Sequence, residues 1–516
     1  MRRIITVAVA AAALLVGAVP AAMAHIPGLP GLPGPSACSP TDWPTYGGSA
    51  HHNFTNATCL NRLNVHSLAP KWFFKTLDAV TANPVVVGNR VYVGSWDGNF
   101  YAIDKATGKQ AWKFAIKPQP AVIPQEGPNG RVLDPTNPES FATSDGGLIT
   151  SSAWYEPASN KTHGRNLVIF GGGYTLYALD ADTGQQVWNH DYTGLPESPP
   201  DPAHDETRIF SSPIVVGNKV IVGVTPDGQD GHRGYVVGAN LQDGSQVWRF
   251  ETSVKTPGGT PVNNGCGGVW SSPTLVESQN VVALDVADCN FKNDPADGIY
   301  NEKVFALHPN DGSLAWVFDP NRPDPGCDYD FGATPNTDGQ SFLGVGSKDG
   351  TYYSIDPATG QRKWATNVLF GGFSGGFLGS SAFDGTRIVG ATALGDFGRF
   401  EGFGSLGCDV GNPNDRPIQE PSIHAFNPAT GAVEWQGHLS QSFGPTTLAG
   451  GMSFVGTGIL RSIQIRNART GLLIHTIPLP APSDSGVSVV GKSIFFGTGS
   501  SEQPAPSGVY AFSALF

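Results

Sequence analysis

The sequence has 516 residues, of which 14% are charged, and it is rich in Gly (67) and Pro (42). This balance is typical of a turn-rich all-β protein and disfavours a helical or disordered chain. The net charge of −12 argues against nucleic acid as a partner, because nucleic acids are bound by basic surfaces.

The N-terminal segment has the pattern of an export signal. Arg2 and Arg3 precede an apolar run over residues 4–19, and Ala22-Met23-Ala24 offers a small-residue cleavage site. We therefore predict a signal peptide over residues 1–24 and a Pro/Gly-rich linker over residues 25–41. No later stretch is apolar and long enough for a membrane span. The mature protein is expected to be soluble and either periplasmic or secreted.

The remaining residues, 42–516, repeat one short motif. Seven copies place an aromatic residue or a histidine four positions after a glycine; they end at Trp112, Trp188, Trp248, Trp316, Trp364, Trp435 and His475. A β-rich run precedes most copies, and a repeat of about 40–70 residues built from short strands is typical of a radial β-array. Each unit can be divided into strands A to D, with the glycine in the tight turn between C and D.

The two ends of the chain complement each other. Residues 508–512 read as a strand C that no tryptophan motif follows, and Trp72 lies in a strand D that no strand C precedes. Together they complete an eighth unit. We predict an all-β fold, an eight-bladed β-propeller of four-stranded antiparallel blades closed by joining the N- and C-terminal strands.

The loops distinguish the two faces of the predicted ring. A–B and C–D turns are short, whereas the B–C and D–A loops are long, over residues 115–150, 189–206, 224–233, 252–269, 287–301, 319–330 and 394–420. Long loops on one face of a rigid scaffold usually carry function, so the site is expected on that face. The repeated tryptophans are expected to pack between blades and to carry no chemistry.

Six cysteines in an exported chain indicate disulfides. In the fourth blade, the antiparallel register of strands A and B brings Cys266 near Cys289 on the long-loop face. Elimination then leaves Cys38–Cys59 and Cys327–Cys408, and all three bridges are expected to staple loops. The chain contains no C-x-x-C-H motif, so no covalent haem is expected. His51 and His52 have no partner spacing for a metal site and are expected at the surface.

Several polar residues and one tryptophan converge on the long-loop face near the ring axis. They are Gln229, Asp230, Trp270, Asp288, Asp328, Asp330 and Lys348, with Gly267 and Gly268 just before the tryptophan. A flat aromatic ring, oxygen ligands and a lysine would suit a planar anionic cofactor bound with a hard cation such as Ca²⁺. Each also has a structural explanation: Trp270 can pack over the glycine pair, and Asp330 can cap the start of a strand. Lys348 can occupy a turn and Asp288 can be a solvated carboxylate.

These repeats and residues resemble those of the pyrroloquinoline quinone (PQQ) enzymes, the eight-bladed quinoprotein alcohol dehydrogenases, with polyvinyl alcohol dehydrogenase as the most similar type. The similarity spans roughly residues 42–516. Gly267-Gly268-Val269-Trp270 matches, one residue shorter, the family's stretch whose Trp forms the floor under the quinone. Tyr329-Asp330-Phe331 matches the segment of the catalytic Asp, and Lys348 matches the Lys or Arg beside the quinone oxygens.

The resemblance implies PQQ and Ca²⁺ as cofactors, with some departures at the metal. Asp288 stands where the family has an Asn ligand, and Asp330 is a second ligand. The family's Glu ligand falls at Gln229 or at its neighbour Asp230, so this carboxylate is displaced or lost. The family's ring of adjacent cysteines is absent, and an Arg that helps to bind the quinone in methanol dehydrogenases falls near Gly146. The Asp at the Asn position leaves calcium and a lanthanide as alternatives.

The implied mechanism is alcohol oxidation. Ca²⁺ and Lys348 would polarise the quinone carbonyl, Asp330 would take the alcohol proton, and a hydride would pass to the quinone. Electrons would leave to an external acceptor such as a cytochrome c. Phe-rich segments over residues 370–377 and 397–403 would suit a bulky or polymeric alcohol, or would pack on themselves. One alternative is a non-catalytic propeller that acts as a protein-binding or assembly scaffold, and another is a degenerate enzyme that still binds a ligand.

Overall fold

The computed structural model describes residues 41–116, 148–192, 209–225, 234–252, 267–287, 300–322, 329–369, 375–393, 422–458, 460–500 and 503–515. The expected signal peptide and the linker up to residue 40 lie outside these ranges. The same holds for Gln229, Asp230, Asp288 and Asp328, the two Phe-rich segments in large part, and every cysteine except Cys59.

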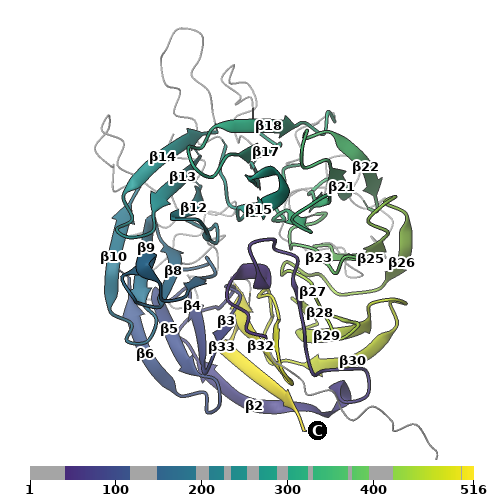
Figure 1. The fold of residues 1–516 in the computed structure, drawn as a ribbon. Helices are drawn as coiled ribbons and strands as arrows, with labels where there is room; N and C mark the ends of the chain where they lie inside the picture. The colour runs from purple at the N-terminus through teal and green to yellow at the C-terminus, as the bar shows by residue number, and fades with distance from the viewer. Residues whose placement is uncertain are drawn as a thin grey trace, which may run out of the picture. The chain divides into compact units, whose positions relative to one another are not determined.

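The described chain forms eight sheets arranged in a ring, as Figure 1 shows, and each contains one blade of four antiparallel strands. In blade 7 a fifth strand, β1(Thr55–Asn56), pairs parallel with the innermost strand of the blade. Blades 1 to 4 consist of β3(Val85–Val87), β4(Arg90–Gly94), β5(Asn99–Asp104) and β6(Gln110–Ala115); β7(Trp154–Glu156), β8(Leu167–Gly172), β9(Thr175–Asp180) and β10(Gln186–Asp191); β11(Ile214–Val216), β12(Lys219–Val224), β13(Tyr235–Asn240) and β14(Gln246–Glu251); β15(Thr274–Val276), β16(Val281–Asp285), β17(Val304–Leu307) and β18(Leu314–Phe318).

Blades 5 to 8 consist of β19(Asn336–Thr337), β20(Leu343–Gly346), β21(Thr351–Ile355) and β22(Arg362–Asn367); β23(Ala382–Phe383), β24(Ile388–Ala391), β25(Ile423–Phe426) and β26(Val433–Gly437); β27(Thr447–Ala449), β28(Met452–Thr457), β29(Ser462–Asn467) and β30(Leu473–Pro478); β31(Ser488–Val490), β32(Ser493–Ser500), β33(Gln503–Ala514) and β2(Leu68–Lys75). The described helices are the short 3₁₀ turns η1(Tyr46–Gly48), η2(Val65–Ser67), η4(Asn160–Thr162) and η5(Glu277–Gln279).

Blade 8 joins the two ends of the chain, which confirms the predicted closure. N-terminal β2 pairs antiparallel with C-terminal β33, and the register places Phe73 opposite Tyr510. Their rings stack with centroids 4.3 Å apart. Every inner strand therefore has partners, and the ring has no open seam at the chain ends.

Burial within the blades differs from the alternating pattern expected for half-buried strands. Strands B and C are buried on both faces, as in β8 and β9, whereas the outer strand D of blade 8, β2, alternates. The reason is that both faces of a blade pack against neighbouring blades, so inner strands read as continuous apolar runs. Exposed side chains concentrate in the outermost strands, as in β6 and β22.

Each repeated tryptophan forms a hydrogen bond that joins its blade to the next one. The indole nitrogens of the seven strand D tryptophans, Trp72 included, donate to a backbone carbonyl at the C–D turn of the following blade, over 2.9–3.0 Å. The turn glycine packs on the ring; at Gly360, with φ of 71°, an added Cβ would lie 2.7 Å from Trp316. Blade 8 has no C–D turn because the two chain ends meet there. The residue of blade 7 that faces blade 8 at the tryptophan position is His475, which lies beside His66.

Residues 43–59, which precede β2 in the sequence, cross the middle of the ring (Figure 1). Their backbone hydrogen-bonds to seven blades, through Val86, Tyr155, Leu275, Thr337, Phe383, Leu448 and Gly491. Most of these residues lie in strand A toward its A–B turn, so the segment closes the axis on the short-turn face. We call residues 43–59 the axial segment. It buries His52 completely, so the expectation that His52 lies at the surface was wrong.

Candidate functional site

The starts of the innermost strands are held in register around the axis by small hydroxyl side chains. The backbone N–H of one blade donates to the hydroxyl of the next: Asn83 to Ser152, Ser152 to Ser212, Ser212 to Ser272, Ser272 to Thr334, and Thr334 to Ser380, over 2.8–3.0 Å. The Ser-Ser-Pro pattern of the sequence therefore forms a hydrogen-bonded belt. The candidate residues of blades 4 and 5 lie just before this belt, at the end of the axis opposite the axial segment.

Trp270 stands directly before strand A of blade 4 and is half-buried. Gly267 has φ of 77°, and its carbonyl accepts a hydrogen bond from the Thr252 hydroxyl at 2.5 Å. Room for the Trp270 ring comes from Gly332 of the next blade, where an added Cβ would lie 3.1 Å from the ring edge. The Lys348 ammonium nitrogen lies 5.2 Å from the centroid of that ring, within range of a cation–π interaction.

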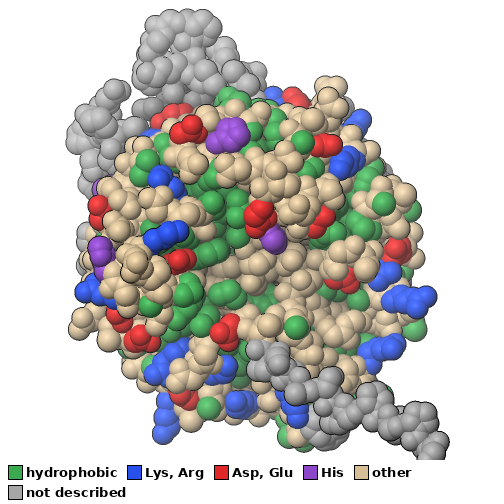
Figure 2. Space-filling model, viewed as in Figure 1, with side chains coloured by type: hydrophobic (Ala, Val, Ile, Leu, Met, Phe, Trp, Pro, Cys, Tyr) green, Lys and Arg blue, Asp and Glu red, His purple; other side chains and the backbone are tan. Residues whose placement is uncertain are grey.

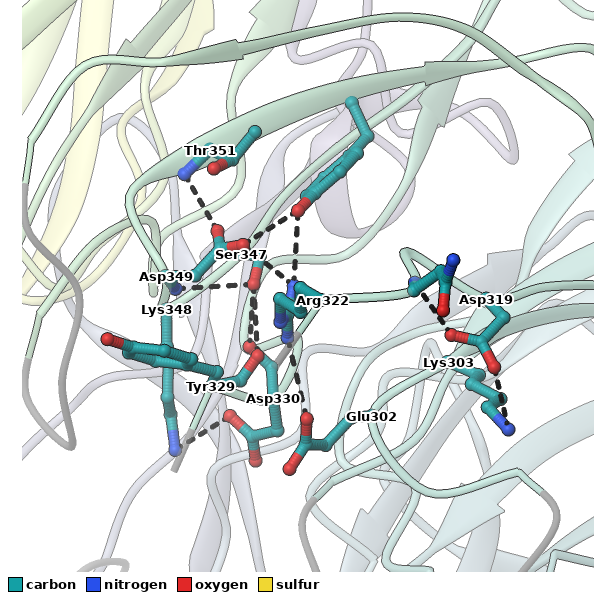
Figure 3. A network of polar contacts seen from close by, with 12 residues as sticks. Glu302, Lys303, Asp319, Arg322, Tyr329, Asp330, Ser347, Lys348, Asp349 and Thr351 are labelled. Atoms are coloured by element: carbon teal, nitrogen blue, oxygen red, sulfur yellow. Dashed lines mark hydrogen bonds and ion pairs between the residues drawn. The ribbon is translucent and has the colours of Figure 1, made fainter. Parts of the chain in front are cut away.

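Asp330 and Lys348 form a buried ion pair, as Figure 3 shows. Lys348 Nζ lies 2.8 Å from Asp330 Oδ1, and the side chains are 8% and 3% exposed respectively. The backbone fixes the pair as well, because the Lys348 N–H donates to the Asp330 carbonyl at 3.0 Å. The Ser347 hydroxyl bonds the same carbonyl. The structure thus brings together both residues that the sequence predicted to be catalytic, and it places them beside Trp270.

A second charged network, not predicted from the sequence, supports the turn that carries Lys348. Arg322 Nη1 lies 2.9 Å from Asp349 Oδ2 and 3.3 Å from the Tyr353 hydroxyl (Figure 3). Burial opposes the charge of Arg322, but Asp349, Tyr353 and Glu302 together outweigh burial, and the pKa of Arg322 is raised. Burial, followed by Asp349, raises the pKa of Tyr353 to about 12. Nothing in the sequence spacing distinguished Arg322 from other loop arginines.

Asp285 is a further carboxyl near the pair, and no sequence motif predicted it. It ends β16 in blade 4 and is fully buried. Its carboxyl oxygens form no well-aligned hydrogen bond among the described residues, and the Ser271 hydroxyl is a nearby donor that opposes the rise of its pKa. Burial, and then the charge of Asp330, raises the pKa of Asp285 well above its ordinary value. Its neighbour on the axial segment is Tyr46, whose hydroxyl lies 3.1 Å from the Ser380 hydroxyl.

The remaining predicted site residues cannot be placed, since Gln229, Asp230 and Asp288 lie outside the described residues. Within the described ranges no group of three or more His, Cys, Asp or Glu side chains forms a metal cluster. Cys59 is disulfide-bonded, and the three predicted pairings stay predictions because the other cysteines are not described.

The distribution of surface charge and the length of the helices are relevant to binding partners and to membranes. On the face drawn in Figure 2, acidic and basic side chains are interspersed among apolar ones rather than gathered by sign. No helix in the described part of the chain is long and apolar enough to cross a membrane.

Comparison with known proteins shows the family of the chain. The family described as "PQQ: Glucose/ethanol/alcohol dehydrogenase, beta-propeller domain" matches residues 43–367. A polyvinylalcohol dehydrogenase of Sphingopyxis sp. (strain 113P3) is 22% identical over 417 residues, which cover 74% of this chain and 56% of that protein. The chain therefore spans about half the length of the curated relatives it matches.

Two solved structures show the fold. The quinohemoprotein alcohol dehydrogenase from Comamonas testosteroni superimposes with a TM-score of 0.66 at 19% identity, covering 92% of this chain and 80% of its own. BamB from Moraxella catarrhalis superimposes with a TM-score of 0.53 at 15% identity, covering 86% of this chain and 99% of its own. At these identities the likeness concerns the architecture alone.

Proposed function

We propose, from the premise that this chain belongs to the PQQ glucose/ethanol/alcohol dehydrogenase β-propeller family, that it is an exported dehydrogenase that oxidises an alcohol with PQQ and Ca²⁺. The observation that carries the proposal is the buried Asp330–Lys348 pair beside the Trp270 ring. A base, a cation and a flat aromatic surface meet there on the axis of the ring.

The described residues fit a planar anionic cofactor. Trp270 offers a flat, half-exposed ring because Gly332 leaves it room, and Lys348 offers an ammonium group within 5.2 Å of that ring. Trp270, with Gly267 and Gly268 before it, would hold the quinone, and Lys348 would bind its oxygens. Asp330, together with Asp288 and Gln229 or Asp230, would hold the cation.

The chemistry of the chain's own residues follows from the pair. Asp330 is a carboxylate that can accept the proton of an alcohol hydroxyl as a general base. Lys348 is an ammonium held at a fixed place, where it stabilises negative charge that develops nearby. PQQ, when bound, would supply the hydride acceptor. A separate acceptor such as a cytochrome c would then take the electrons.

Reconstitution tests the proposal. The purified chain is mixed with PQQ and Ca²⁺, and dye reduction is followed with small, bulky and polymeric alcohols. We expect turnover, and we expect Asp330→Asn to lower kcat by about 10²- to 10⁴-fold, the usual contribution of a general base. Circular dichroism and PQQ binding control for the fold. The absence of PQQ binding with any cation would overturn the proposal, and an unchanged kcat would show that Asp330 is not the base.

The rival function is a non-catalytic scaffold, because a propeller fold by itself does not require a catalytic site. A buried carboxylate–ammonium pair costs desolvation energy, and binding of a protein partner does not require such a pair. The same reconstitution separates the two: a chain that binds neither PQQ nor a cation but retains a protein partner would be a scaffold.

A further inference from the structure

The position of Asp285 in the repeat is unusual. Register places it opposite Val304, and the corresponding residue at the end of strand B is glycine in six blades: Gly94, Gly171, Gly223, Gly346, Gly456 and Gly497. Blade 6 has Ala391 there. The carboxyl-bearing residue thus occurs in one blade of eight, and that blade carries Trp270.

Sterics explain the glycines and give the direction of the Asp285 side chain. At each of the six glycines, an added Cβ would lie 2.1–2.4 Å from one residue of the next blade. In every case that residue precedes strand A of its blade by the same number of positions. Val269 is that neighbour for Gly223, and Phe377 is that neighbour for Gly346. The equivalent residue for blade 4 is Phe331. The Asp285 side chain is therefore directed at the Asp330–Phe331 segment of the candidate site.

Local contacts agree with this direction. The Asp285 backbone N–H lies 3.3 Å from the hydroxyl of Ser271, the residue after Trp270, and the Asp330 charge acts on the Asp285 carboxyl. Among the described residues, the groups that face it are Ser271 before strand A of blade 4, Asp330 on blade 5 and Tyr46 on the axial segment. None of them is a cation, and Lys348 beyond Asp330 is already paired with Asp330.

Charge balance completes the argument. A buried carboxyl that has one weakly placed hydroxyl donor and no cation beside it destabilises a fold, and glycine at the same place, as in six other blades, carries no such group. In addition, the Asp330 charge is neutralised by Lys348, so a divalent cation at Asp330 would need a further carboxylate.

We propose that Asp285 is an additional oxygen donor for the cation of the site, directly or through one water. The inference rests on the proposed function, since it concerns the cation that would accompany PQQ. It assigns a ligand outside the loops that carry the other candidate ligands, on the buried end of β16.

The test is cation binding by the full chain. Ca²⁺ is titrated calorimetrically with and without PQQ, and Tb³⁺ is titrated by luminescence excited through tryptophan. The variants are Asp285→Asn, which removes the charge at constant shape, and Asp285→Gly, which restores the residue of the other blades. Asp319→Asn, an exposed carboxylate paired with Lys303, is the control.

We expect both Asp285 variants to weaken Ca²⁺ and Tb³⁺ binding by about 10- to 100-fold, the usual effect of altering a group around a metal, and the control to match the wild type. Thermal unfolding of Asp285→Gly should occur at or above the wild-type temperature. Wild-type affinity in Asp285→Asn would overturn the inference and leave the proposed function intact. A wild-type chain that binds PQQ but no cation would also overturn it, whereas a chain that binds neither would overturn both.

Discussion

The buried Asp330–Lys348 pair can be tested by its effect on stability. At 2.8 Å, two unit charges attract each other by about 6 kcal/mol at an effective dielectric constant of about 20. Most of this gain is offset by the cost of removing both groups from water, since the side chains are only 3% and 8% exposed. Removing one partner leaves the other buried and uncompensated, which costs about 3–5 kcal/mol.

The assay is a double-mutant cycle in urea, followed by tryptophan fluorescence. Asp330→Asn and Lys348→Met should each lower the free energy of unfolding by about 3–5 kcal/mol. The double variant should lose much less than the sum, with a coupling of at least about 2 kcal/mol. The half-exposed Lys303–Asp319 pair, 3.0 Å apart, is the matched control, with a coupling below about 1 kcal/mol. Additive losses at Asp330 and Lys348 would refute the pairing.

Two further predictions concern the ring itself. Gly360→Ala should lower the free energy of unfolding by about 1–3 kcal/mol more than Gly88→Ala, because both have positive φ but only Gly360 packs on Trp316; equal losses in urea would contradict the docking. Burial, and then His51, lowers the pKa of His52 to about 3. Unfolding therefore takes up a proton below about pH 6.5, and stability falls by up to about 1.4 kcal/mol per pH unit from there toward pH 3. His52→Gln should flatten this slope and exposed His163→Asn should not; parallel slopes in urea unfolding against pH would exclude His52 as the cause.

The blade count and the closure could be predicted because both leave a repeated local signal. A glycine four residues before a tryptophan recurs since each tryptophan must fit the next turn, and Trp72 keeps the signal even in the divided blade. Asp330 and Lys348 could be predicted because their motifs start and end strands whose positions the repeat fixes. His475 departs from the motif for a reason visible only in three dimensions, namely that the following blade has no C–D turn.

The axial segment and Asp285 escaped prediction for different reasons. Residues 43–59 have no periodicity, since their bonds go to strands that lie far away in the sequence, and His52 therefore seemed a surface residue. Asp285 did leave a signal, an aspartate in the register of glycines. This signal can be recognised only when strand B of every blade is aligned by its pairing with strand C.

The axial segment also has a consequence for how the protein folds. Its contacts join residues up to 433 positions apart, such as Thr58 and Gly491, so they form only after the last blades exist. Contacts of such length are associated with slow folding, because loop-closure entropy is lost before the contacts compensate for it. The ring should consequently fold and unfold as one cooperative unit, and a chain shortened by a few blades at either end should not reach a stable partial ring.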